Sequence, residues 1–118
     1  MNTETPMNHA PAFYATIYAE MREAAKNLGW ALAVHGSLQR DLDVIGVPWT
    51  DGAVCEDDFI RSMWIVVTGR YKASECKAEC KPFGRVAYAI PVYGCSGSIE
   101  NERRASFVDL STVGCERR

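Results

Sequence analysis

Two aspartates stand two residues apart in the segment HGSLQRDLD, which covers residues 35–43. If this segment leads into a strand, the alternation of side chains along a strand places Asp41 and Asp43 on one face and Leu42 on the other. Two carboxylates held close together repel each other unless a cation binds them. Carboxylate oxygens are hard ligands that suit Mg²⁺ or Mn²⁺, so the pair predicts a divalent metal site.

A third carboxylate lies near the other end of the chain, in the segment FVDLS. Asp109 sits there between apolar residues of an expected strand, where a bare carboxylate needs a partner. If the two strands are neighbours, Asp109 completes a cluster with Asp41 and Asp43. The alternative, in which Asp41 and Asp43 are a solvated strand edge with turn-capping duties, stays open.

A glycine–serine turn comes just before the aspartates. Gly36 allows the backbone to approach a ligand closely, and Ser37 offers a hydroxyl and a backbone N–H to phosphate oxygens. A plain tight turn would use the same two residues. Because the two aspartates follow this turn closely, the turn indicates a phosphate-binding position beside the predicted metal site.

Two helices are expected from apolar residues that recur every three to four positions. The first covers residues 11–28, and its apolar face consists of Phe13, Ile17, Met21, Ala24 and Leu28. The second follows an acidic first turn at residues 56–58 and ends at Gly69. Its apolar face consists of Phe59, Ile60, Met63, Trp64 and Val67.

Four apolar runs predict strands, and the first two are close enough to form an antiparallel hairpin. They cover residues 30–35, 42–47, 86–93 and 106–113. Pro91 favours an edge or late position in its strand, and a short helix is expected over residues 74–80. The order of elements predicts an α+β fold, a small mixed sheet with helices packed on one face. A flexible tail, residues 1–10, precedes a single domain over residues 11–118.

The turn, the two aspartates and the later strand aspartate together resemble the DNA polymerase beta-type nucleotidyltransferase superfamily. The blocks HGSLQRDLDVIGVPW, KPFGRVAYAI and FVDLS are similar to small nucleotidyltransferase-like proteins that are common in phage genomes. The resemblance implies a minimal nucleotidyltransferase-like fold. It also implies that Asp41, Asp43 and Asp109 are catalytic metal ligands for Mg²⁺ or Mn²⁺.

By the same resemblance, Gly36 and Ser37 form the phosphate turn, and Arg40, Lys81 and Arg85 neutralise charge on phosphate oxygens. The implied partner is a nucleoside triphosphate or another nucleotide. Only three residues separate Ser37 from Asp41, so the phosphate cradle is shorter than in the superfamily. That leaves a second hypothesis, a catalytically silent binding protein of this fold, for example a phage protein that interferes with a host defence system.

The sequence also offers three alternatives: a cysteine zinc site, a zinc peptidase and a pure interaction module. Cys76 and Cys80 could form a zinc site with Cys95 or Cys115, although scattered free thiols fit the spacing better. A zinc peptidase needs a second histidine near His35, and the other one is His9 in the tail. A pure interaction module would use a contact patch made of Trp30, Trp49 and Trp64.

Composition sets outer limits on these hypotheses. The chain has 118 residues, 47% of them hydrophobic, and a net charge of −2. This balance argues against nucleic-acid binding by bulk electrostatics, although a local basic patch can exist within a balanced total. No run approaches a membrane span, no secretory signal is visible, and five cysteines fit no secreted framework. We therefore expect a cytoplasmic protein with no membrane partner, in the bacterial host cytoplasm if it is phage-encoded.

Overall fold

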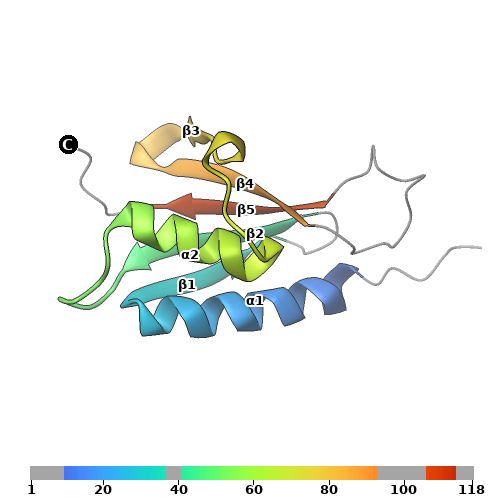
Figure 1. Ribbon diagram of the computed structural model, residues 1–118, viewed down its shortest axis with the longest axis horizontal. Helices are drawn as coiled ribbons and strands as arrows, with labels where there is room; N and C mark the ends of the chain where they lie inside the picture. The colour runs from blue at the N-terminus through green and yellow to red at the C-terminus, as the bar shows by residue number, and fades with distance from the viewer. Residues whose placement is uncertain (1–9, 37–40, 93–105, 114–118) are drawn as a thin grey trace, which may run out of the picture.

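The computed structural model describes residues 10–36, 41–92 and 106–113, and these form an α+β domain (Figure 1). The two helices are α1 (Ala10–Asn27) and α2 (Glu56–Thr68). The strands are β1 (Trp30–His35), β2 (Leu42–Pro48), β3 (Ala78–Cys80), β4 (Val86–Val92) and β5 (Ser106–Thr112). Two short 3₁₀ turns, η1 (Ala73–Glu75) and η2 (Pro82–Gly84), flank β3.

The strands form one mixed sheet in the order β1-β2-β5-β4-β3. Strands β1 and β2 form the expected antiparallel hairpin. Strand β5 lies at the centre, parallel to β2 and antiparallel to β4. The sheet therefore places two segments that are far apart in the sequence, β2 and β5, directly side by side.

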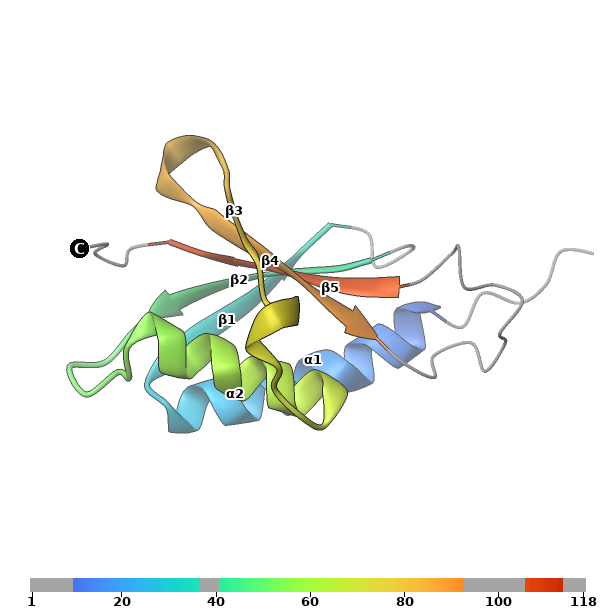
Figure 2. The ribbon, with the colours of Figure 1, turned by 45° about the horizontal axis from the view of Figure 1, so that its top comes forward.

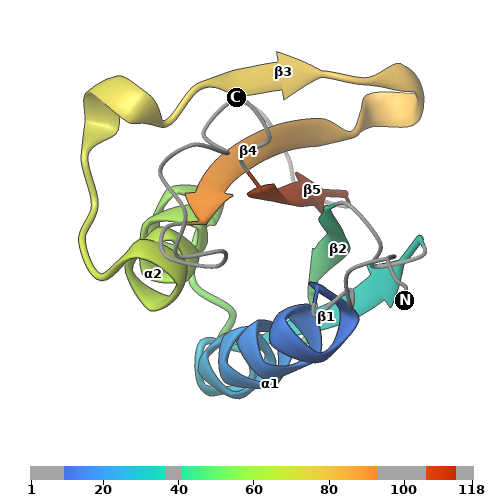
Figure 3. The same ribbon diagram turned by 90° about the vertical axis from the view of Figure 1, so that its right-hand side faces the viewer.

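Both helices cover the same face of the sheet (Figures 2 and 3). Alternate residues of the central strands point into this layer and are buried there: Leu42, Val44, Ile90, Val108 and Leu110. They pack with Tyr14 and Met21 of α1 and with Phe59, Met63 and Trp64 of α2. Neither helix of the described ranges covers the opposite face (Figure 3), as expected for an antiparallel or mixed sheet with one solvated side. The expected architecture, helices on one face of a small mixed sheet, is confirmed.

The segment before β4 differs from the sequence expectation. A short helix was expected over residues 74–80, and this is wrong: the chain makes one 3₁₀ turn and then the strand β3. An isolated helix of two turns is marginal in water, whereas β3 gains antiparallel pairing with Val86–Tyr88 of β4.

Pro91 lies where the sequence predicts it. Strand β3 pairs only with the first half of β4, so at Pro91 the one strand paired with β4 in the described chain is β5. A proline lacks the N–H that a second neighbour would need, so this local edge accommodates it.

Neither helix in the described ranges combines the length and the apolar character that a membrane crossing requires.

Candidate functional site

The carboxylates of Asp43 and Asp109 lie on neighbouring strands at the same level of the sheet. Their Cα atoms are partners in the parallel register of β2 and β5. Partners in register project to the same side of a sheet. The residues on either side of each aspartate are buried beneath the helices, so both aspartates project from the face that no helix covers. Asp41 is two residues before Asp43 and lies on that same face.

These acidic side chains influence one another electrostatically. Burial raises the pKa of the Asp43 carboxyl, the negative charges of Asp109 and Asp41 raise it further, and His35 lowers it. His35 is the β1 residue paired with Asp43, so it stands on the other side of Asp43 from Asp109. The structure thus places Asp43 between Asp109 on β5 and His35 on β1.

The three carboxylates do not form one tight ligand set. Within residues 10–36, 41–92 and 106–113, no group of three or more His, Cys, Asp or Glu side chains is arranged to hold a metal ion. The assignment of Asp41, Asp43 and Asp109 to a single ion therefore stays a prediction. Asp43 and Asp109 are directly paired across neighbouring strands.

Gly36 packs directly against the Asp43 carboxylate. Its φ is +91°, and a Cβ atom placed on it would stand 2.7 Å from Oδ2 of Asp43. A side chain here would need both an unfavourable left-handed backbone and displacement of the carboxylate. Gly36 was expected to let the backbone approach a ligand, and this stays a prediction; the group that the structure places against Gly36 is the Asp43 carboxylate.

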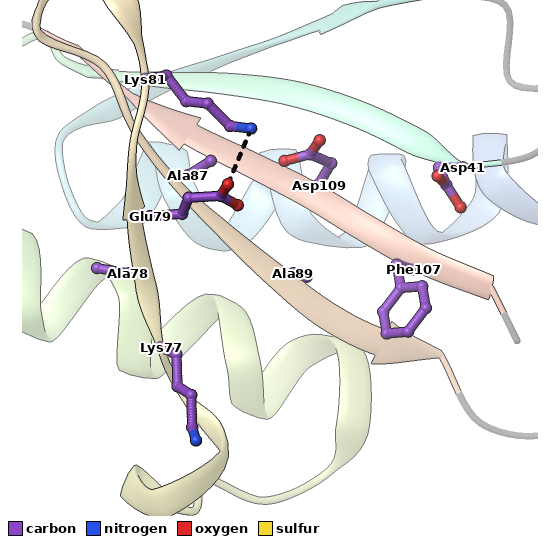
Figure 4. Close-up of a pocket in the computed structure, with 9 residues that line it drawn as sticks. All are labelled: Asp41, Lys77, Ala78, Glu79, Lys81, Ala87, Ala89, Phe107 and Asp109. Carbon is purple, nitrogen blue, oxygen red and sulfur yellow. Dashed lines mark ion pairs between the residues drawn. The ribbon is translucent and has the colours of Figure 1, made fainter.

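A cavity of about 340 Å³ opens on this face of the sheet (Figure 4). Asp109 and Phe107 of β5 line it together with Asp41, which lies at the end away from Lys81. The small side chains of Ala87 and Ala89 on β4 leave the space open. The rest of the lining comes from the segment that includes β3: Lys77, Ala78, Glu79 and Lys81. One cavity therefore combines carboxylates with ammonium groups.

Two of the predicted basic residues are engaged in this region. The Lys81 ammonium lies 3.4 Å from a carboxylate oxygen of Glu79, on the cavity side of β3 (Figure 4). Arg85 donates a hydrogen bond of 3.0 Å from Nη1 to Oγ of Ser111. Ser111 is two residues after Asp109 in β5, so this bond fixes Arg85 over the same face of the sheet. The other predicted phosphate contacts, Ser37 and Arg40, lie outside the described residues.

The other candidates from the sequence are separated. Cys76 and Cys80 carry free thiols, burial raises the pKa of Cys76, and Cys95 and Cys115 lie outside the described residues. Trp30 and Trp64 are buried in the core, whereas Trp49 is 76% exposed. The three tryptophans therefore do not form one surface patch.

Sequence reasoning missed several residues of the cavity: Lys77, Glu79, Ala87, Ala89 and Phe107. One signal was present. In VAYAIPV the alanines alternate with larger apolar residues, and alternation places small residues on one face of a strand. Glu79 could not be found this way, because β3 was not expected to be a strand.

No known family model matches the chain, and no curated protein matches it significantly.

Proposed function

We propose that the uncovered face of the sheet binds a divalent cation together with the phosphates of a nucleotide, and that the protein is a minimal metal-dependent nucleotidyltransferase. The observation that carries the proposal is the in-register pair of Asp43 and Asp109, of which Asp109 lines a cavity together with Asp41 and Lys81. The resemblance of the GS and DLD segments to nucleotidyltransferases agrees with this placement.

Two carboxylates suit Mg²⁺ or Mn²⁺, which do not need a full set of protein ligands. Mg²⁺ keeps several waters and is commonly bound by one or two carboxylates plus substrate phosphates. Asp43 and Asp109 supply two carboxylates on adjacent strands. Burial raises the pKa of Asp43, and the negative charge of Asp109 raises it further. A cation between them would relieve this repulsion.

The basic side chains supply the complementary half of a phosphate site. Lys81 would exchange its partner Glu79 for a phosphate oxygen, which is a modest change because Glu79 is largely exposed and water weakens such a pair. Arg85 has five N–H donors, so its bond to Ser111 orients the guanidinium and leaves other donors for phosphate.

In the transfer reaction, Asp43 and Asp109 would hold the cation through their carboxylate oxygens. When bound, the cation supplies Lewis-acid polarisation of the phosphate that reacts. Asp41, at the far end of the cavity from Lys81 (Figure 4), would accept the proton of the attacking hydroxyl as its oxygen bonds to the α-phosphorus. The bond to pyrophosphate breaks, and Lys81 and Arg85 stabilise the charge on the leaving oxygens.

A catalytically silent nucleotide-binding protein is the second candidate. The specific observation in its favour is that no three-carboxylate metal group occurs in the described part of the chain. Such a protein would need the cation and Lys81 for binding, but it would not need Asp41 as a base.

Calorimetric titration with Mg²⁺ and Mn²⁺, with and without a nucleoside triphosphate, tests the proposal. We expect saturable binding that Asp43→Ala or Asp109→Ala abolishes, and that Asp51→Ala, at an exposed turn, leaves intact. Absence of saturable binding in the presence of nucleotide would overturn both candidates. Transfer of a labelled nucleotide to an acceptor then separates the two, because only the transferase loses an activity in Asp41→Asn.

A further inference from the structure

A fully exposed aromatic ring stands at the turn between β3 and β4. Phe83 is 100% exposed, and it is the one non-glycine residue with positive φ in the described ranges, at φ 66° and ψ 31°. The left-handed region is unfavourable for a residue with a Cβ, and glycine or asparagine is the usual choice there. Neither local conformation nor burial therefore explains a phenylalanine at this position.

The turn presents this ring away from the rest of the molecule. The backbone N–H of Lys81 donates to the carbonyl of Arg85 at 2.9 Å and closes the turn. No heavy atom lies within 4 Å of a Cβ placed on Gly84, so the space beside Phe83 is open. Figure 2 shows the hairpin of β3 and β4 projecting beyond the sheet and the helices.

The segment that carries the ring has the opposite charge from the rest of the chain. Residues 70–85 contain five basic and two acidic side chains, a net charge of +3, so the remainder of the chain carries −5. The basic residues of the segment are Arg70, Lys72, Lys77, Lys81 and Arg85. Lys77 and Lys81 flank the two ends of β3, and both line the cavity.

We infer that the β3–β4 hairpin binds single-stranded nucleic acid, with Phe83 stacked on an unpaired base and Lys77, Lys81 and Arg85 contacting phosphates. Aromatic rings that alternate with cations form the general platform for single strands, because each base has a π-face and each linkage a negative charge. A protein partner would favour an apolar surface around the ring, whereas the residues next to Phe83 along the chain are Pro82 and Gly84, flanked by the two cations Lys81 and Arg85. This site goes beyond the proposed metal site and does not depend on it.

Fluorescence anisotropy of labelled strands tests this inference in EDTA and low salt, where the metal site makes no contribution. Separate titrations with oligo-dT and oligo-rU of about 12 nucleotides, within the size range of single-strand sites, distinguish DNA from RNA. We expect saturable binding of at least one strand. Phe83→Ala should weaken it roughly 5- to 100-fold, the range for loss of one stacked base, and Phe83→Trp should retain it.

Two further variants distinguish base stacking from phosphate contacts and from nonspecific binding to an exposed aromatic ring. Lys77→Gln should lower the slope of log affinity against log salt by about 0.7, the value for one phosphate contact on a single strand. Trp49→Ala removes another strongly exposed aromatic ring and should leave binding unchanged. Phe83 makes no buried contact, so its variants should fold.

Several outcomes would overturn the inference. These are no saturable binding of either strand, equal binding by Phe83→Ala and the unaltered chain, or equal losses in Phe83→Ala and Trp49→Ala. A change in oligomeric state in Phe83→Ala without any effect on strand binding would show that a second copy of the chain covers the ring instead. Loss of metal binding alone would leave this site intact, so its failure and that of the metal site are distinguishable.

Discussion

The indole of Trp30 lies flat on the ring of Phe59, with ring centroids 3.9 Å apart and an interplanar angle of 3°. Trp30 begins β1 and Phe59 belongs to the first half of α2, so the stack joins the edge of the sheet to the second helix. The indole N–H also donates to the carbonyl of Val54 at 2.8 Å, which satisfies the polar atom of a buried tryptophan. These contacts hold the start of α2 against the hairpin that leads to the site.

Gly46 is the residue that makes room for this stack. A Cβ placed on it would lie 2.8 Å from two carbon atoms of the Phe59 ring. Gly46→Ala should therefore displace the ring from Trp30 and lower the free energy of unfolding by about 1–3 kcal/mol, as overpacking does. Gly52→Ala is the matched control, because no heavy atom lies within 4 Å of its Cβ position. Equal unfolding midpoints in urea for the two variants would contradict this packing.

Gly36→Ala should lower the free energy of unfolding by more than the cost of its left-handed backbone conformation alone. The left-handed backbone costs an alanine about 1–2 kcal/mol, and Gly69→Ala measures this cost, because Gly69 has φ +90° with no neighbour within 4 Å. At Gly36 the new methyl group also meets the Asp43 carboxylate. We expect Gly36→Ala to be less stable than Gly69→Ala and to bind Mn²⁺ more weakly. Similar losses of stability, with unchanged Mn²⁺ affinity, would show that the carboxylate moves aside freely.

Asp43→Asn should stabilise the metal-free protein near neutral pH. A carboxyl whose pKa is raised on folding contributes stability that is fully present below the unfolded pKa and is lost as the pH rises through the folded pKa. Burial is the largest cause of the raised pKa of Asp43, followed by Asp109. The expected gain is about 0.5 kcal/mol or less because water screens a partly exposed carboxylate. It should vanish below about pH 3, where carboxyls are protonated in both states.

Thermal unfolding in EDTA across this pH range measures the effect. Asp51→Asn removes one negative charge from an exposed turn and controls for the change in net charge. If both variants gain equally at neutral pH, the crowding of carboxylates around Asp43 is not the cause.

Phe83→Gly should raise the stability of the protein even though it removes a large side chain. Glycine adopts φ 66° without a Cβ clash, which recovers part of the 1–2 kcal/mol cost of the left-handed region; the greater flexibility of the unfolded glycine chain offsets some of this. The expected net gain is about 0.5–1 kcal/mol in urea unfolding. Phe83→Ala keeps the Cβ and should show no such gain. Destabilisation by Phe83→Gly would mean that the ring has packing partners in solution.

The parts of this fold that could be predicted from the sequence are those encoded locally. The apolar spacing of Phe59, Ile60 and Met63 predicted α2, and the short gap between the first two apolar runs predicted the hairpin of β1 and β2. Strand β3 has only three residues and depends on pairing with β4. No periodicity over so few residues distinguishes a strand from a helical turn.

The candidate site also has a part that local sequence predicts and a part that depends on long-range contacts. Alternation along the strand predicted that Asp41 and Asp43 share one face, and Asp109 was expected to join them if the two strands are neighbours; β2 and β5 are paired in the described chain. The pairing of Lys81 with Glu79 and the proximity of His35 to Asp43 follow from the register of the sheet, which is determined by long-range contacts. The left-handed conformation of Phe83 was unexpected as well, because the sequence PFG allows the more usual alternative with glycine alone in that region.

The central position of β5 has a consequence for how the domain assembles. Strand β5 pairs with β2 and β4, yet it follows both of them along the chain as the last strand of the described ranges, and its Asp109 lies 66 residues after Asp43. A nascent chain emerging from the ribosome presents β2 and β4 with unpaired inner edges until β5 is synthesised and inserts between them. Such non-local, partly parallel pairing closes slowly and leaves strand edges open to wrong partners in the meantime. The pairing of Asp43 with Asp109 therefore depends on the insertion of β5, because the two residues become neighbours only when β5 pairs with β2.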